Sequence, residues 1–319
     1  MIVVIGEALI DLIGRGGSKY EAVVGGANAN VALALAVRGE EQAFLGRISK
    51  DGFGQLIRNH LSANGVNLEY AVEAEEQTSL AVATIDESGV ATYSFYLNGT
   101  ADWGWKKDEL PGVETLKSLG VKAIQFGCLG MAIEPGSKVI EQWLREVSSQ
   151  SSITLSHDLN IRPAVGLSRE SEQDRVARIN SFSQIVKASD ADIEWLFDVD
   201  TETEVDAIAS RWSEGKLVLV TRGEKGVRAY LDKVVFDVPG FPVALVDTVG
   251  AGDTFMASFL AEMSALGYLG GSVSIASISS EKLKKAIEIS NAAAAIVCER
   301  TGCEPPTKDE IRLRLANAR

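Results

Sequence analysis

Hydrophobic positions along this chain form short continuous runs that alternate with longer stretches of helical spacing. The short runs are typical of buried strands and lie at Val3–Ile5, Gln42–Leu45, Ala123–Cys128, Ile153–His157 and Leu217–Thr221. Helical spacing predicts helices at Asn28–Arg38, Phe53–Leu61, Ser137–Val147, Arg175–Gln184 and Val205–Glu214. Asp51 is placed to cap the second of these helices. Because strands and helices alternate, the pattern indicates βαβ units.

Two segments toward the N-terminus have a different pattern. Leu9–Val24 and Thr78–Tyr96 each contain two β-prone pieces separated by a polar turn that contains glycine, which predicts two β-hairpins. We therefore expect an α/β fold with a doubly wound, largely parallel sheet, helices on both faces, and a small β appendage.

Composition and charge narrow the range of functions. The chain has 319 residues, 46% of them hydrophobic and 24% charged, which is enough for a large globular core. The net charge of −13 argues against a nucleic-acid partner, and no apolar run approaches the ~20 residues of a membrane span. Three cysteines without paired spacing predict reduced thiols and a cytoplasmic location. With only two histidines, a histidine-rich zinc site is not expected.

The candidate chemistry lies in the segment from Val243 to Phe255. The pattern predicts an apolar strand at Val243–Val246, a glycine loop at Gly250–Gly252, and then a helix. Free N–H groups at a helix start attract anionic oxygen, and glycines let the backbone approach it closely. Asp253 is a candidate base for a hydroxyl group, although a role as helix N-cap would also explain an aspartate here.

Several motifs in this sequence match those of one enzyme family. Asp247–Phe255 resembles the C-terminal signature of the ribokinase-like (PfkB) carbohydrate kinases, and Gly25–Asn30 with Gly46–Gly54 resembles the N-terminal one. Gly6–Leu12 resembles the opening of the fructokinase branch. The resemblance covers essentially the whole chain. It implies an ATP-dependent sugar kinase with a single domain over residues 1–319 and a lid from about 9–24 and 77–105.

The resemblance also implies roles for individual residues around the sugar. The sugar-binding positions are Asp11, Gly25, Gly26, Asn30 and Arg162. The anion hole comprises Gly250, Ala251 and Gly252, and Asp253 is the catalytic base. Asn30 would alternatively be a polar residue at a helix boundary, and Arg162 a surface arginine before a rigid turn.

On the nucleotide side, the resemblance implies ATP contacts from Thr221, Gly223, Asn291 and Ala294. Mg²⁺ is expected with ATP, and Asp247 matches a site for a monovalent cation such as K⁺. The sequence departs from the family at Ser189-Asp-Ala-Asp192, where Asn-x-x-Glu is usual. The link of Asp192 to the magnesium–phosphate network is therefore left open.

Fructose is the first candidate substrate, on the basis of Gly6–Leu12, Asn98–Asp102 and Asp158–Pro163. The alternatives are 2-keto-3-deoxygluconate, then ribose or a nucleoside, and a homodimer is left open. Neither G-x-G-x-x-G after the first strand nor G-x-x-x-x-G-K-[ST] is present, which argues against an NAD-dependent dehydrogenase and a P-loop enzyme. A non-catalytic sugar or nucleotide sensor is disfavoured because Asp253 and both loop glycines are present.

Overall fold

Eight strands make up the central sheet of this computed structural model, which describes residues 1–14, 18–85, 91–271 and 273–317. In sheet order they are β14 (Val234–Val238), β13 (Val227–Leu231), β12 (Leu217–Thr221), β11 (Ile185–Ser189), β10 (Thr154–Asp158), β9 (Ala123–Gly127), β1 (Ile2–Ile5) and β4 (Gln42–Leu45). Neighbouring strands are parallel from β12 to β4, and β13 pairs antiparallel with both β12 and β14. The expectation of a largely parallel sheet is confirmed.

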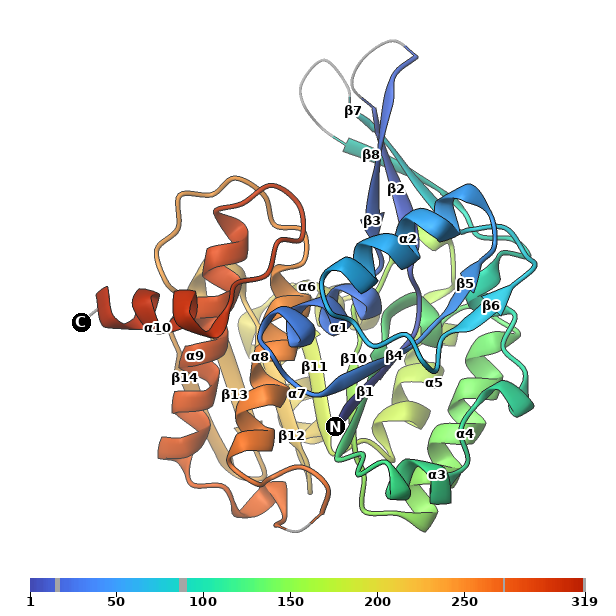
Figure 1. Ribbon diagram of the computed structural model, residues 1–319. Coiled ribbons are helices and arrows are strands. Elements are labelled where there is room, and N and C mark those ends of the chain that lie inside the picture. The colour runs from blue at the N-terminus through green and yellow to red at the C-terminus, as the bar shows by residue number, and fades with distance from the viewer. Residues whose placement is uncertain (15–17, 86–90, 272, 318–319) are drawn as a thin grey trace.

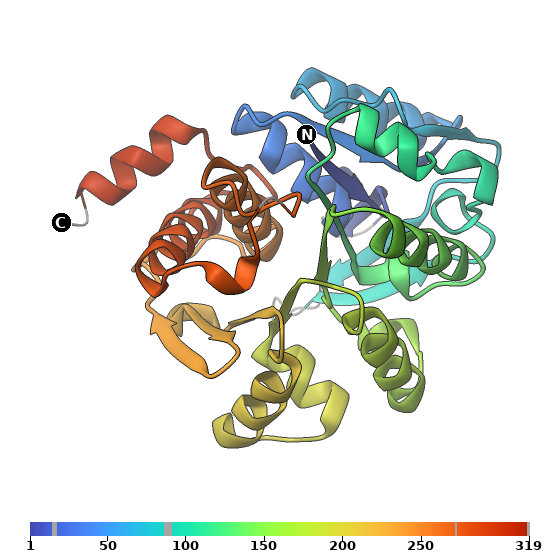
Figure 2. The same ribbon diagram turned by 90° about the horizontal axis from the view of Figure 1, so that it is seen from below.

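Helices cover both faces of this sheet (Figure 2). One layer contains α1 (Ala27–Val37), α8 (Ala251–Ala265) and α9 (Ser280–Cys298), with α10 (Lys308–Asn317) packed on α9. The other contains α3 (Val113–Ser118), α4 (Gly136–Gln150), α5 (Arg169–Asn180), α6 (Asp190–Phe197) and α7 (Glu202–Trp212). Side chains of β1 alternate between the layers, since Ile2 and Val4 pack with the first and Val3 and Ile5 with the second. This two-sided burial explains why the parallel strands are continuously apolar.

The two predicted hairpins pair with each other in a second sheet, which we call the small sheet. It contains β3 (Tyr20–Gly25), β2 (Leu9–Gly14), β7 (Leu80–Ile85) and β8 (Ala91–Tyr96), in that order. Both hairpins are antiparallel, as expected, and β2 joins β7 in parallel. The small sheet projects from the body of the molecule (Figure 1). The tips predicted at the turns of these hairpins lie outside the described residues.

The segment between the hairpins is anchored by a capped helix. The predicted cap is confirmed, because the Asp51 carboxylate accepts a hydrogen bond of 2.7 Å from the Gly54 N–H group at the start of α2 (Gly52–Ala63). A short parallel pair, β5 (Arg47–Ser49) and β6 (Val72–Ala74), precedes and follows this helix.

The strand predicted at Val243–Val246 is wrong. This segment is irregular, and the side chains of Leu245 and Val246 are 64% and 59% exposed. Instead of joining the edge of the sheet, its backbone crosses to the end of α9, where the N–H groups of Val246 and Asp247 both donate to the Cys298 carbonyl. An apolar run therefore indicated a strand where the chain serves as a connection leading to α8.

No helix in the described part of the chain combines the length and the apolar character that crossing a membrane requires.

Candidate active site

A cleft of about 500 Å³ opens at the carboxyl ends of the central strands and is lined by both sheets. Ligands of open α/β sheets bind at this edge. Residues that the sequence predicted as functional and that the structure brings together here are Asp11, Gly26, Asn30, Arg162, Gly250, Gly252 and Asp253. They come from segments as far apart as β2 and α8, so the fold assembles the cleft from distant parts of the chain.

The floor of the cleft includes the N-terminus of α8. Gly250 is the N-cap residue, with a φ of 75°, in the left-handed region that favours glycine. Over the described part of the chain, the N–H groups of Gly252 and Asp253 have no hydrogen-bond acceptor. Unpaired N–H groups and the helix dipole together make this loop suited to an anionic oxygen.

Asp253 lies inside the first turn of α8 and not at its cap. Its carboxylate accepts a hydrogen bond of 2.8 Å from the side-chain amide of Asn30 on α1, and both side chains are buried. Burial raises the pKa of Asp253 to about 7; the Asn30 hydrogen bond and the charges of Lys187 and Arg162 lower it, while Asp158 adds to the rise. A carboxyl group with this pKa can accept a proton near neutral pH.

Asp11 from β2 and Arg162 from the loop after β10 also line the cleft. Burial raises the pKa of Asp11 to about 6, although the positive charge of Arg162 opposes the rise. Gly25, on the neighbouring strand β3, leaves room for this carboxylate, because a Cβ atom there would lie 2.2 Å from Asp11 Oδ2. Arg162 is exposed to the cleft, which fits a ligand contact better than a packing role.

One charged residue that sequence reasoning did not single out, Lys187, also belongs to this region and pairs with Asp158. Lys187, in β11, lines the cleft, and its Nζ atom lies 2.9 and 2.8 Å from the two carboxylate oxygens of Asp158 at the end of β10. Asp158 is part of the motif Asp158–Pro163, but a lysine inside a strand carries no sequence signal of its own.

Asp192 has a structural role in the same region. One of its carboxylate oxygens accepts from the Ile161 N–H group at 2.8 Å and the other from the Ser189 N–H group, also at 2.8 Å. The carboxylate therefore ties the start of α6 to the loop that carries Arg162. Both oxygens are already engaged with backbone N–H groups.

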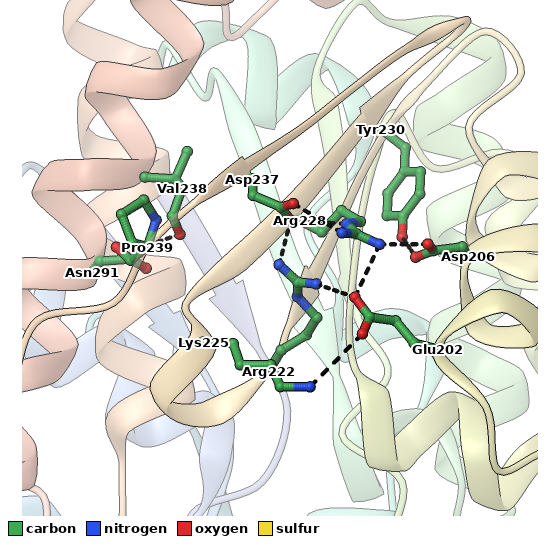
Figure 3. Close-up of polar contacts among 10 residues, drawn as sticks. All are labelled: Glu202, Asp206, Arg222, Lys225, Arg228, Tyr230, Asp237, Val238, Pro239 and Asn291. Carbon is green, nitrogen blue, oxygen red and sulfur yellow. Dashed lines mark hydrogen bonds and ion pairs between the residues drawn. The ribbon is translucent and has the colours of Figure 1, made fainter.

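The predicted nucleotide residues Thr221, Gly223, Asn291 and Ala294 are not among the described residues that line the cleft. Thr221 ends β12, and Gly223 lies exposed in the short turn that follows. The side-chain amide of Asn291, on α9, donates to the carbonyls of Val238 and Pro239 at the exit of β14 (Figure 3). Ala294 packs against the core.

Ion pairs fix the turn that carries Gly223. The guanidinium groups of Arg222 and Arg228 share the carboxylates of Glu202, at the start of α7, and Asp237, on β14 (Figure 3). Arg222 lies only 2.7 Å from Glu202 and is itself largely buried. The ion pairs hold the exit of β12 in place. Both arginine side chains are already paired with carboxylates of the protein.

Asp247 joins the loop before α8 to the turn after α9. Its carboxylate accepts from the Val249 N–H group at 3.1 Å and from the Gly302 N–H group at 2.9 Å. Cys303, in the same turn, lies against Gly250, since a Cβ atom at that glycine would be 2.3 Å from the sulfur. The conformation of the anion-binding loop thus depends on residues near the C-terminus.

Comparisons with known proteins identify the family and the fold of this chain. Residues 1–310 match the family described as pfkB family carbohydrate kinase. Among curated proteins, the chain is 33% identical over 314 residues to probable fructokinase-5 of Arabidopsis thaliana, covering 96% of this chain and 93% of that protein. It is also 33% identical over 323 residues to fructokinase-1 of Zea mays, covering 98% and 96%.

Solved structures share the fold at lower sequence identity. Fructokinase with bound ATP from Xylella fastidiosa has a TM-score of 0.89 at 23% identity, covering 99% of this chain and 98% of that one. Fructokinase from Vibrio cholerae with fructose, ADP and calcium ion has a TM-score of 0.83 at 23% identity, covering 98% of each chain. Aminoimidazole riboside kinase from Salmonella enterica, with its riboside and an ATP analogue, has a TM-score of 0.81 at 21% identity, covering 99% of each chain.

Proposed function

The chain belongs to the pfkB family of carbohydrate kinases, and from this we propose that it transfers the γ-phosphoryl group of ATP to a hydroxyl group of fructose, with Asp253 as the base. The observation that carries the proposal is the buried Asp253 carboxylate, hydrogen-bonded to Asn30 and next to the unpaired N–H groups of α8. The relatives named fructokinase supply the choice of sugar.

In the proposed reaction, the sugar hydroxyl oxygen forms a bond to the γ-phosphorus while the bond from that phosphorus to the β–γ bridging oxygen breaks. ADP leaves with the electron pair, and the hydroxyl proton passes to Asp253. The free N–H groups of Gly252 and Asp253 stabilise the negative charge of the phosphoryl oxygens. The family resemblance implies an anion hole at Gly250, Ala251 and Gly252, whereas the Ala251 N–H group donates to the Thr248 carbonyl. Asp11, Asn30 and Arg162 are placed to hold the sugar in the same cleft.

The residues present fit a magnesium ion that is held mainly by ATP. Within the described ranges, no group of three or more His, Cys, Asp or Glu side chains could bind a metal ion by itself. Mg²⁺ in kinases takes substrate phosphates, water and one or two carboxylates, and when bound it shields charge between the phosphates. Because both oxygens of Asp192 accept backbone N–H groups, we propose that Asp192 joins this network through water.

For the nucleotide, we propose that ATP lies over the exit of β12, near Thr221 and Gly223, with its base toward Asn291 and Ala294. The rigid turn built by the Arg222 ion pairs supports this placement. Asp247 is the proposed contact for a monovalent cation such as K⁺. The single domain over 1–319, the lid formed by the small sheet, a homodimer and a cytoplasmic location stay predictions.

The test is ADP release from ATP and Mg²⁺ over a panel of sugars. We expect the highest kcat/KM with fructose, and lower values with 2-keto-3-deoxygluconate, ribose and nucleosides. A higher kcat/KM with one of the other compounds would replace fructose as the substrate. Measurable binding of ATP or sugar without turnover on any of them would favour a sensor over an enzyme.

A further inference from the structure

Lys187 is a buried cation inside the cleft, and the proposed reaction assigns it no role. The residue is only 5% exposed, although it lines the same cleft as Asp253 and Gly252. A lysine is rarely this buried unless its charge is paired. Its position in the middle of β11 places the charge next to the α8 N-terminus.

Its partner, Asp158, holds the ammonium group from one side. The Nζ atom lies 2.9 Å from Asp158 Oδ1 and 2.8 Å from Oδ2, and Asp158 is equally buried. A lysine ammonium has three N–H donors. Among the residues that the structure describes, Nζ has no acceptor other than these two oxygens, which leaves one donor for a ligand.

The ammonium lies close to the anion-binding loop. A Cβ atom built on Gly252 would lie 3.3 Å from Lys187 Nζ and 3.8 Å from Cε. An anionic oxygen held by the N–H groups at this helix start would therefore be close to the ammonium. Glycine at position 252 is what allows the cation to come so near to the loop.

The ammonium stays charged in this setting. Burial alone would lower the pKa of Lys187, but the charges of Asp158, Asp192 and Asp253 outweigh burial and raise it. Arg162 is a second cation that acts on Asp158 and Asp253 in the same cleft. A fixed cation beside the anion-binding loop offsets the repulsion that these carboxylates exert on an incoming phosphoryl group.

We propose that Lys187 contacts the phosphoryl group during its transfer from ATP to the sugar, and that Asp158 is a positioning residue that fixes the ammonium beside Gly252. The inference rests on the proposed function. Lys187 keeps its proton throughout, because the hydroxyl proton goes to Asp253 and the electron pair leaves with ADP. Its N–H group stabilises the non-bridging phosphoryl oxygens, whose charge the transition state spreads.

The competing interpretation is that the pair only stabilises the fold. Removing one partner of a buried ion pair leaves an uncompensated charge and destabilises a protein, whereas removing both charges is often neutral. A loss of activity in Lys187→Met alone could therefore come from a lost phosphoryl contact or from a destabilised fold. The double variant Lys187→Met/Asp158→Asn removes both charges and keeps side chains of similar size, so it separates the two roles.

The experiment compares the wild type with both variants by thermal unfolding, by kcat and KM for ATP, and by the affinity for two nucleotides. ADP probes ground-state binding, and ADP with aluminium fluoride and sugar mimics the transferring phosphoryl group. We expect both variants to lose about 10²- to 10³-fold in kcat and a similar factor in affinity for the aluminium fluoride complex. Affinity for ADP should change by less than about threefold, and the double variant should recover the Tm.

A double variant that recovers both the Tm and a kcat within about threefold of the wild type would overturn the proposal, since the pair would then be structural. Equal losses of affinity for ADP and for the aluminium fluoride complex would also overturn it. Failure of the proposed function would be visible separately, because the wild type itself would then show no turnover on any sugar.

Discussion

Removing the Asn30 amide should change the pH dependence of catalysis in a predictable direction. The amide donates to Asp253 and so favours its ionised form, against burial, which holds the pKa at about 7. A hydrogen bond to a charged group contributes about 1.5–3 kcal/mol. At 1.36 kcal/mol per pKa unit, its loss in Asn30→Ala raises the pKa of Asp253 by about 1 to 2 units.

The acid limb of kcat/KM against pH reports this pKa in the free enzyme. A base works only when it is deprotonated, so activity is lost as pH falls through the pKa. We expect the limb to move from about 7 in the wild type to about 8–9 in Asn30→Ala. At pH 7, ionisation alone then lowers kcat/KM by about 5- to 50-fold, and activity recovers as the pH is raised toward the new plateau.

The assay is ADP formation in stopped time points, measured from pH 5.5 to 9.5 without pH-sensitive coupling enzymes. The matched control is Asn28→Ala, since Asn28 is a buried amide on the same helix that donates to Glu7 instead of Asp253. Its acid limb should stay near pH 7. If Asn30→Ala lowers the plateau but leaves the limb in place, Asp253 is not the group whose ionisation sets the limb.

Three further predictions follow from the same geometry. Asp253→Asn should raise the Tm above that of the wild type, and the difference should grow as pH rises from 4 to 8. The reason is that the wild type must ionise a buried carboxyl whose pKa has risen from 3.8 to about 7, which costs about 4 kcal/mol of folding free energy. A difference in Tm that does not vary with pH would contradict this prediction. Gly250→Ala should lower kcat on the order of 10²-fold, because alanine is strained at the φ of 75° and its Cβ meets the Cys303 sulfur. Gly250→Ala/Cys303→Gly relieves only the clash and should recover part of the loss, and a loss that is the same in both variants would refute the clash as a cause. Arg222→Met should raise the KM for ATP by about two- to fivefold at low salt and by less at 1 M salt. An unchanged KM would show that the ion pairs of Arg222 do not contribute to nucleotide binding.

The sequence predicts the central sheet well where strands are apolar on both faces, as in β1, β4 and β12. It misses β11, because Lys187 interrupts the apolar run of that strand. A lysine fits there only because Asp158, on the neighbouring strand, neutralises it. That compensation comes from tertiary structure, so local periodicity does not contain it. The opposite error occurs at Leu245 and Val246, where apolar residues predicted a buried strand and the structure has an exposed connection.

In the candidate site, too, the sequence identifies single residues, whereas their contacts come from tertiary structure. Motif spacing identifies Asp253 and Asn30 separately, but they are 223 residues apart, and only the packing of α1 against α8 makes them partners. Asn291 is predicted beside the nucleotide, and the structure adds that its amide is bound to the backbone at the exit of β14. Roles that depend on one residue can be proposed from sequence, whereas hydrogen-bond partners require the fold.

Whether Asp253 is the catalytic base is tested most directly by the formation of sugar phosphate from ATP and fructose by the wild type and by Asp253→Asn, measured together with ADP binding to both. We expect one sugar phosphate for each ADP in the wild type, and a loss of about 10²- to 10⁴-fold in kcat for Asp253→Asn, with ADP affinity retained. Turnover by Asp253→Asn close to that of the wild type would rule out Asp253 as the base, because the proton of the sugar hydroxyl would then pass to another group.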